Sequence, residues 1–274
     1  MSLAAVTRSE TTKQFTTSMW WILAIVLFAY VGFTASVLAF VFSASATGAL
    51  PGNAPQIPAE GLPAVLYSTA TSVGYVFPLL IGTLAVTGEF RHQTLTPTFL
   101  ATPRRGTVLV GKLAVGVLLG VLYGIVGIFA AVGPSAGFLA GYGLDTDFTS
   151  SDTWAMLGRM VLAYVLWVFI GIGIGALVRN QVGAIVGVLV FTQFLEPVAR
   201  AAASFVDGLS DVTKYLPGAA SDALVGASVF SVSTATTGST SDPLEWWVGA
   251  LVLLGYGILF VVLGWLSSWR RDVS

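Results

Sequence analysis

The feature that most constrains this sequence is a series of apolar stretches, each about 20 residues long, that recurs along its whole length. At 1.5 Å per residue, a helix of that length crosses a hydrocarbon layer of roughly 30 Å. Charged residues make up 9% of the sequence, whereas a soluble domain has about 25%. The stretches are continuously apolar rather than alternating, which favours helices over a β-barrel. The sequence therefore predicts an all-α integral membrane protein.

Six spans account for the apolar stretches. We place them at residues 19–43, 62–86, 107–132, 154–178, 181–205 and 244–268. Residues 1–18 are expected to form an amphipathic helix at the cytoplasmic interface, residues 19–268 the six-helix membrane domain, and residues 269–274 a cytoplasmic tail. Six crossings put both termini on one side.

The distribution of basic residues sets the orientation. Nine of the twelve lysines and arginines fall on one side of the predicted spans: Arg8, Lys13, Arg91, Arg104, Arg105, Lys112, Arg179, Arg270 and Arg271. The other side is rich in aspartate: Asp145, Asp147, Asp152, Asp207, Asp211, Asp222 and Asp242. Since cytoplasmic loops are enriched in lysine and arginine, both termini are predicted to be cytoplasmic. A net charge of −1 offers no basic face for nucleic acid.

Two connecting segments are long enough to have structure of their own. Residues 87–106 form a basic cytoplasmic loop, and residues 206–243 lie outside, where a re-entrant or interfacial helical hairpin is expected. The turn at residues 179–181 is tight, which predicts that the fourth and fifth helices are antiparallel neighbours.

The sequence offers little support for an enzyme. Residues 106–113 nearly match a phosphate-binding loop, but Leu113 stands where Ser or Thr would hold magnesium, and no strand precedes the segment. His92 is the single histidine and there is no cysteine, so neither a metal site nor a nucleophile with its base can be assembled from them. We expect the chain to bind no metal and no cofactor of its own.

Glycines and one proline stand out within the spans. Gly116, Gly120 and Gly124 are spaced by four, which lets helix backbones approach closely. Packing within one subunit is the commoner use of such a stripe, and a subunit interface is the alternative. Pro78 is a candidate kink in the second helix.

Glu196 and Arg200 lie four residues apart near the outer end of the fifth helix, a spacing that favours an ion pair. They are either a structural pair or, with Phe33, Tyr75, Phe191 and Gln193, part of a pathway for a large apolar solute. For the aromatic residues, packing against lipid is the alternative to a pathway. Arg159 is most simply a residue that reaches from the fourth helix to the interface.

The run at residues 87–105, TGEFRHQTLTPTFLATPRR, resembles the loop after the second helix of type-2 ABC-transporter permeases, in the form common in actinobacteria. Glu10, Lys13 and Trp20 resemble the amphipathic lead-in of the same family. Six spans with an elaborate outer segment before the last also match. The sequence departs from the family at Gln93, where glycine is more frequent.

The resemblance implies a permease subunit of a bacterial plasma-membrane exporter, surrounded by membrane lipids. Two copies, as a homodimer, would sit above two cytoplasmic ABC ATPase subunits, which bind the ATP and Mg. The basic loop becomes a coupling helix, and its expected contacts with the ATPase are Glu89, Phe90, Arg91, His92, Thr94, Thr102, Arg104 and Arg105, joined by Glu10 and Lys13. The expected substrate is an amphiphilic drug, an antibiotic or a lipid-like molecule.

Three alternatives stay open. Arg104 and Arg105 are equally explained by positive-inside anchoring. The whole chain could be a channel or scaffold that works without an ATPase, although such a channel would need intramembrane polar rings and the sequence offers few. A lipid-modifying enzyme would need clustered His, Asp or Glu near one interface, which the single histidine argues against.

Overall fold

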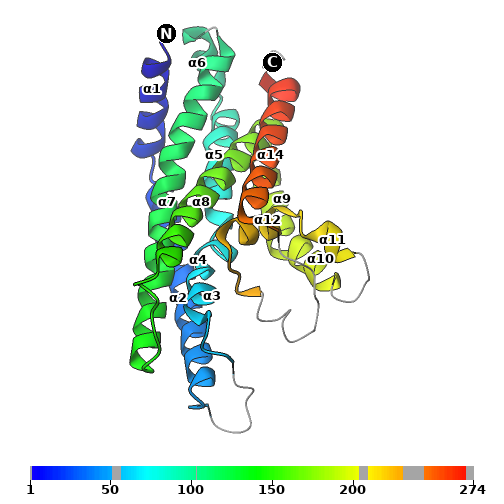
Figure 1. Cartoon of the computed structure of the whole chain (residues 1–274). Coiled ribbons are helices and arrows are strands. Elements are labelled where there is room, and N and C mark those ends of the chain that lie inside the picture. Colours follow the sequence, from blue (N-terminus) through cyan, green and yellow to red (C-terminus); the bar gives the residue numbers. More distant parts are fainter. Residues whose placement is uncertain (1, 51–56, 103, 204–208, 231–243, 270–274) are drawn as a thin grey trace.

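The structure is a computed structural model that describes residues 2–50, 57–102, 104–203, 209–230 and 244–269, and every regular element in these residues is a helix (Figure 1). Six helical stretches of the described residues are long and apolar enough to cross a membrane: Met19–Ala46, Leu62–Arg91, Arg105–Gly141, Ser151–Leu177, Gln181–Ala202 and Trp246–Ser267. Each matches one expected span. The prediction of an all-α protein with six potential membrane spans is confirmed.

Several of these stretches contain more than one helix. The first two helices are α1 (Leu3–Thr16) and α2 (Met19–Ala46); α3 (Leu62–Tyr67), α4 (Thr69–Ser72) and α5 (Val76–Arg91) make the second span. They are followed by α6 (Leu95–Ala101), α7 (Arg105–Gly141) and α8 (Ser151–Leu177). The fifth span consists of α9 (Gln181–Val190), the π-helix η1 (Phe191–Leu195) and α10 (Glu196–Ala202). Then come α11 (Leu209–Thr213), α12 (Pro217–Val225), α14 (Trp246–Gly264) and the π-helix η2 (Trp265–Trp269).

Helix α8 is the centre of the bundle, since α5, α7, α12 and α14 all pack against it. Glycines allow the closest approaches. Gly120 of α7 meets the backbone of Val165, and Gly171 of α8 meets the carbonyl oxygen of Leu79. Gly116 and Gly124 also face α8, so the glycine stripe packs within one subunit, as the commoner interpretation predicts.

The fifth span lies elsewhere than expected. Helix α9 packs chiefly against α5 and has little contact with α8, although only the residues around Asn180 separate α8 from α9. The prediction that the fourth and fifth helices are packed neighbours is wrong. The faces of α8 are already taken by α5, α7, α12 and α14, so the tight turn carries α9 past α8 to α5.

The second span is interrupted rather than kinked at its proline. The helix pauses at Ser68 and again at residues 73–75, and Pro78 lies in the first turn of α5. Proline is tolerated there because the first N–H groups of a helix have no intrahelical partner. The hydroxyl of Tyr164 donates to the carbonyl oxygen of Ala70 at 2.5 Å, which satisfies one backbone group next to the break.

The segment at residues 206–243 contains two short helices in its described part, α11 and α12. Helix α12 packs against α14, α8 and α4. Gly249 of α14 lies against the backbone of Ala220 and Leu224, and the indole N–H of Trp167 donates to Ser221 Oγ at 3.1 Å. Helix α12 is therefore part of the bundle. Residues 231–243 of this segment lie outside the described residues.

Candidate functional site

The predicted coupling loop folds into a short helix at one end of the bundle. Helix α6 lies between the end of α5 and the start of α7, at the same end as α1 and the last turns of α14 (Figure 1). The turn that leads into it contains Gln93, whose φ of 55° is in the left-handed region. Glycine adopts this conformation without steric cost, so Gln93 occupies a position that glycine would fill with less strain.

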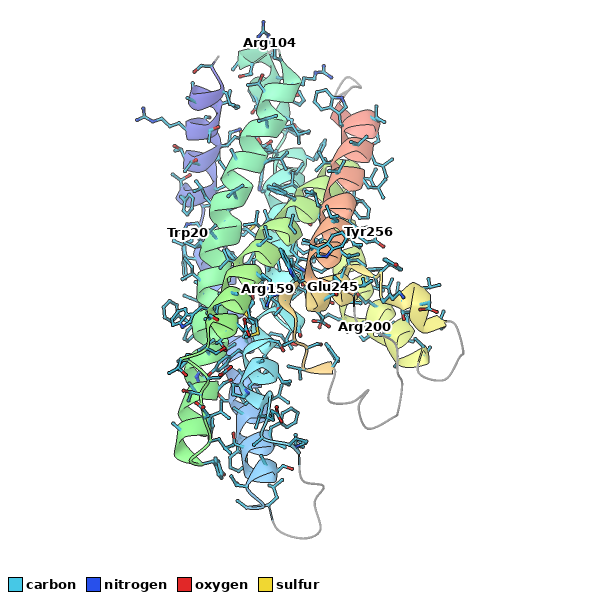
Figure 2. All side chains as sticks on the ribbon, in the orientation of Figure 1. Trp20, Arg104, Arg159, Arg200, Glu245 and Tyr256 are labelled. Carbon is cyan, nitrogen blue, oxygen red and sulfur yellow. The ribbon has the colours of Figure 1, made fainter. Side chains whose placement is uncertain are left out.

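Helix α6 has one covered and one open side. Leu95 is buried, and the guanidinium of Arg105 lies over the ring of Phe99 at 5.1 Å. Leu100 lies on the open side, where it is 79% exposed. The nearby residues Arg91, His92, Thr94 and Arg104 are exposed as well, and Figure 2 shows Arg104 at the extreme end of the bundle. This side of α6 thus combines one exposed leucine with basic residues.

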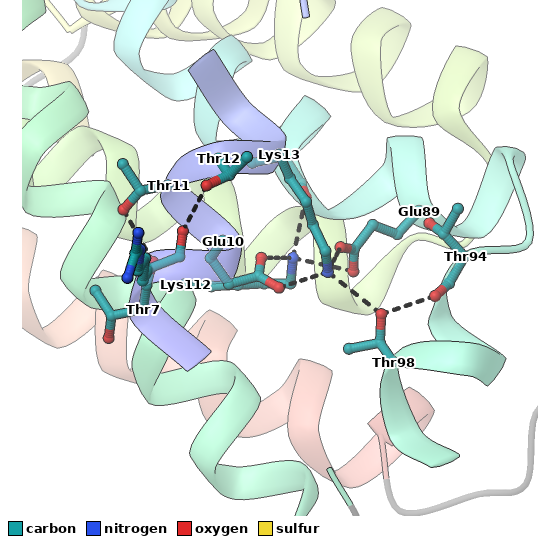
Figure 3. A network of polar contacts seen from close by, with 11 residues as sticks. Thr7, Glu10, Thr11, Thr12, Lys13, Glu89, Thr94, Thr98 and Lys112 are labelled. Carbon is teal, nitrogen blue, oxygen red and sulfur yellow. Dashed lines mark hydrogen bonds and ion pairs between the residues drawn. The ribbon is translucent and has the colours of Figure 1, made fainter. Parts of the chain in front are cut away.

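Four charged residues meet beneath α6 and form what we name the α1 cluster: Glu10, Lys13, Glu89 and Lys112 (Figure 3). Lys112 Nζ lies 2.6 Å from Glu10 Oε2 and 3.0 Å from Glu89 Oε2. Lys13 Nζ lies 2.6 Å from Glu10 Oε1 and 3.0 Å from Glu89 Oε1. Two carboxylates and two ammonium groups thus alternate, and each carboxylate oxygen faces a cation.

Burial makes this arrangement strongly interdependent. The side chain of Lys112 is 2% exposed and that of Lys13 is 35% exposed. Burial by itself favours the neutral form of Glu10, but the charges of Lys112 and Lys13 outweigh it, so the pKa of Glu10 is lowered from its ordinary value. Burial likewise opposes the charge of Lys13, yet Glu89 and Glu10 raise its pKa. Removal of any one member would leave two opposite charges with one partner each in place of two.

The α1 cluster ties α1 to three other helices. Helix α1 lies alongside α7, where Val6 packs over Gly111. Lys13 Nζ also donates to Thr98 Oγ1 of α6 at 3.2 Å, and Lys112 Nζ donates to the carbonyl oxygen of Ala85 in α5 at 3.4 Å. Side-chain contacts of the α1 cluster therefore join α1 to helices α5, α6 and α7.

The expected coupling residues divide into two groups. Arg91, His92, Thr94 and Arg104 lie on the open surface, with Phe90 and Arg105 half-buried beside it. Glu10, Lys13, Glu89 and Thr102 point inward. We expected Glu89 to contact a docked partner directly, but its carboxylate is used inside the protein by two lysines. Sequence reasoning did not single out Lys112, Thr98 or Leu100. An ionisable residue within an apolar run was the signal for Lys112.

A second group of polar residues surrounds α12, and we name it the α12 cluster: Ser72, Glu196, Arg200, Asp222 and Ser228. Arg200 Nη2 lies 2.6 Å from Asp222 Oδ2, and Asp222 also accepts hydrogen bonds from Ser72 at 2.9 Å and Ser228 at 2.8 Å. Glu196 Oε1 accepts from the backbone N–H of Gly218 at 2.6 Å and of Ala219 at 3.2 Å, and so caps α12.

The predicted ion pair between Glu196 and Arg200 is therefore not the one in the structure. Both residues lie on α10 at the expected four-residue spacing, but the Glu196 carboxylate is held by the backbone N–H groups of Gly218 and Ala219. Arg200 instead reaches Asp222 of α12. Arg159 also differs from expectation, since it lies against Gly226 at the carboxyl end of α12 and over the ring of Trp246 at 5.9 Å. Figure 2 shows Arg159 and Arg200 about half-way along the bundle.

Among the residues proposed for a pathway, Tyr75 lies close to the charged groups of Glu196 and Arg200. Tyr75 is buried against Trp167, with ring centroids 4.6 Å apart, and donates to the carbonyl oxygen of Thr192 at 2.9 Å. Phe33 is 72% exposed on α2. Gln193 is exposed and Phe191 half-buried on the π-helix. Packing toward lipid, the alternative raised for the aromatic residues, suits Phe33.

Comparison with known proteins adds no assignment: no protein-family model matches the sequence, and no curated protein matches it.

Proposed function

We propose that this chain is the transmembrane permease subunit of an ATP-driven exporter of the type-2 ABC class. The observation that carries the proposal is α6, a short helix at one end of a six-span bundle that presents Leu100 to solvent among Arg91 and Arg104. An exposed leucine gains most from an apolar pocket, and the surrounding cations favour an acidic rim. A soluble ATPase with such a pocket is the partner that this surface suits.

The position of α6 explains how movement of a partner would reach the membrane. Helix α6 is joined directly to α5 on one side and to α7 on the other. Through Lys13 and Thr98 it is also joined to α1, which continues into α2. A displacement of α6 would therefore act on the first three spans together. Glu89 contributes by keeping this joint rigid rather than by touching the ATPase.

The remaining parts of the proposal come from the resemblance of residues 87–105. Two copies of the chain work with two ATPase subunits, and ATP and Mg are bound by those subunits. The broad apolar faces of α2, α9, α10 and α14 suit contact with lipid and with the second copy. The solute is an amphiphilic drug, an antibiotic or a lipid-like molecule, and it leaves between the two halves on the side where α12 lies.

Co-isolation tests the docking surface. The protein would be taken from native membranes in mild detergent, and the amount of ATPase that accompanies it would be measured for Leu100→Asp. A charge in the apolar pocket should weaken association by about 2 kcal/mol or more, as at an interface hot spot. Val212→Asp is the matched control, because Val212 is 65% exposed on α11, outside the proposed surface.

Two results would contradict the proposal. One is the absence of any ATPase in extracts from which other transporter complexes are recovered intact. The other is an equal loss of ATPase with both variants. Either result would favour the alternative of a channel or scaffold that works without an ATPase.

A further inference from the structure

Glu196 is a buried carboxylate with a spare oxygen. The residue is 2% exposed. Its Oε1 caps α12 through Gly218 and Ala219, whereas its Oε2 is buried and has no hydrogen-bond partner among the described residues. An ionised oxygen in this state is costly, because it has lost water and gained no donor in exchange. An arrangement that brings a donor to Oε2 would remove this cost.

Such an arrangement is available to Arg200. Glu196 and Arg200 are four residues apart on α10, the spacing at which an acid and a base on one helix pair well. In the structure Arg200 is instead paired with Asp222 of α12 at 2.6 Å. One guanidinium thus has two carboxylates within reach, one on its own helix and one on α12.

We propose that Arg200 is a two-position switch, which holds α12 in the bundle when it pairs with Asp222 and releases α12 when it pairs with Glu196. Arg200 has a carboxylate partner in both positions. Asp222 keeps the hydroxyl of Ser228, which lies only six residues further along the chain. Asp222 loses its cation in the exchange, whereas loss of the pair without an exchange would leave both Asp222 and Arg200 without an opposite charge.

The surroundings of Glu196 suit a movable carboxylate. Gly218 leaves room for it, since a Cβ at that position would lie 2.5 Å from Glu196 Oε1 and 2.8 Å from its carboxyl carbon. The π-helix η1 precedes Glu196 and Pro197 follows it, and both weaken the regular hydrogen bonding of the helix. Phe194 of η1 and Val198 of α10 are both exposed, so few contacts oppose an adjustment of this segment.

The same exchange would reach the second span. Ser72 is the last residue of α4, directly before the interruption at residues 73–75, and it donates to Asp222 Oδ1 at 2.9 Å. Release of α12 would remove this contact from the break. The role of α12 as an outer gate rests on the proposed export function, whereas the exchange of ion pairs does not.

A single reporter thiol tests the exchange in the protein alone. The chain has no cysteine, so Val225→Cys, at a fully buried position of α12, gives one site for a water-soluble maleimide. Labelling rates would be measured in lipid nanodiscs without any ATPase. Failure of the docking proposal would therefore leave this result unaffected. Val168→Cys, buried in α8, reports any general loosening of the bundle.

Two neutralising substitutions should act in opposite directions. In Asp222→Asn, Arg200 loses its carboxylate partner on α12 and should pair with Glu196. The labelling rate at residue 225 should therefore rise by about tenfold or more. Glu196→Gln keeps an acceptor for the N–H groups of Gly218 and Ala219 but cannot pair with Arg200, so labelling should stay at or below the original rate. Asp211→Asn on α11, which neutralises an exposed carboxylate, should have no effect.

If both carboxylates merely hold α12 in place, Glu196→Gln and Asp222→Asn will both accelerate labelling, and that result overturns the proposal. Gly218→Ala gives a second route should Asp222→Asn fail to fold. Its methyl group pushes the Glu196 carboxylate away from α12, so labelling should rise, and adding Glu196→Gln should reverse the rise. No reversal would likewise overturn the proposal.

Discussion

The α1 cluster and the α12 cluster both bury charge inside the bundle, but they differ in balance. In the α1 cluster two carboxylates and two lysines face one another so that all four carboxylate oxygens have a cation. In the α12 cluster a single arginine lies near two carboxylates and pairs with Asp222. Glu89 Oε2 and Glu196 Oε2 both lack a hydrogen-bond partner within the described residues, but Glu89 Oε2 faces Lys112 at 3.0 Å, whereas Arg200 is paired with Asp222. The first arrangement has one satisfied state. The second has a spare acceptor, and so a second state is available to it.

The two clusters differ in how easily their ion pairs can rearrange. A closed ring of charges fixes α1, α5, α6 and α7 relative to one another, which suits a part that transmits a push without bending. A cluster with a spare acceptor can rearrange, which suits a part that opens. Four predictions test this contrast between the two clusters.

The largest effect is expected from Lys112→Met. This change leaves Glu10 and Glu89 buried with only Lys13 between them, and it should lower the free energy of unfolding by about 3–5 kcal/mol. Thermal unfolding in detergent would measure it. Lys214→Met is the matched control, because Lys214 pairs with the exposed carboxylate of Asp211 and should matter by about 1 kcal/mol at most. Equal effects of the two changes would mean that the α1 cluster adds no rigidity.

Arg200→Gln should be less damaging than Lys112→Met. Asp222 keeps its hydrogen bonds from Ser72 and Ser228, so the expected loss in free energy of unfolding is about 1–3 kcal/mol. The same unfolding assay measures it. A loss as large as that of Lys112→Met would show that the α12 cluster is as closed as the α1 cluster, contrary to the comparison.

The α1 cluster should make the stability of the protein depend on pH. The lowered pKa of Glu10 means that its contribution is present above its ordinary value of 4.5 and is lost as pH falls through the lowered pKa. The raised pKa of Lys13 means that its contribution is present below 10.5 and is lost as pH rises through the raised pKa. Melting temperatures measured across pH should therefore fall at both extremes. Glu10→Gln should flatten the acid side, and an unchanged acid side would contradict the account.

The smallest effect is expected from Thr98→Val, which removes the hydrogen bond between Lys13 and α6 without altering any charge. The expected loss is about 0.5–1.5 kcal/mol, with faster hydrogen exchange in α1 and α6. Thr96→Val, at an exposed position on the same helix, is the control for the change in side-chain chemistry. Faster exchange in both variants would show that α6 loosens for reasons unrelated to Lys13.

The sequence predicts the spans well and their partners poorly, for physical reasons. The length and polarity of an apolar run are local properties, which is why all six stretches lie where expected. The choice of α5 as the neighbour of α9 depends on which faces of α8 are already filled. The spacing of Glu196 and Arg200 suggested a local pair, but the tertiary position of α12 gives both side chains other partners. Glu10 and Lys112 lie more than 100 residues apart, and only folding brings them together.

Cross-linking from Leu100 of α6 tests whether an ABC ATPase docks on this helix. The absence of cysteine allows Leu100→Cys to carry a single photoactivatable maleimide in native membranes. The account predicts that illumination joins this chain to an ABC ATPase subunit, identified by mass spectrometry, and that the same probe at Val212→Cys on α11 does not. Cross-linking from Leu100→Cys to lipid alone, or ATPase captured equally from both positions, would contradict it.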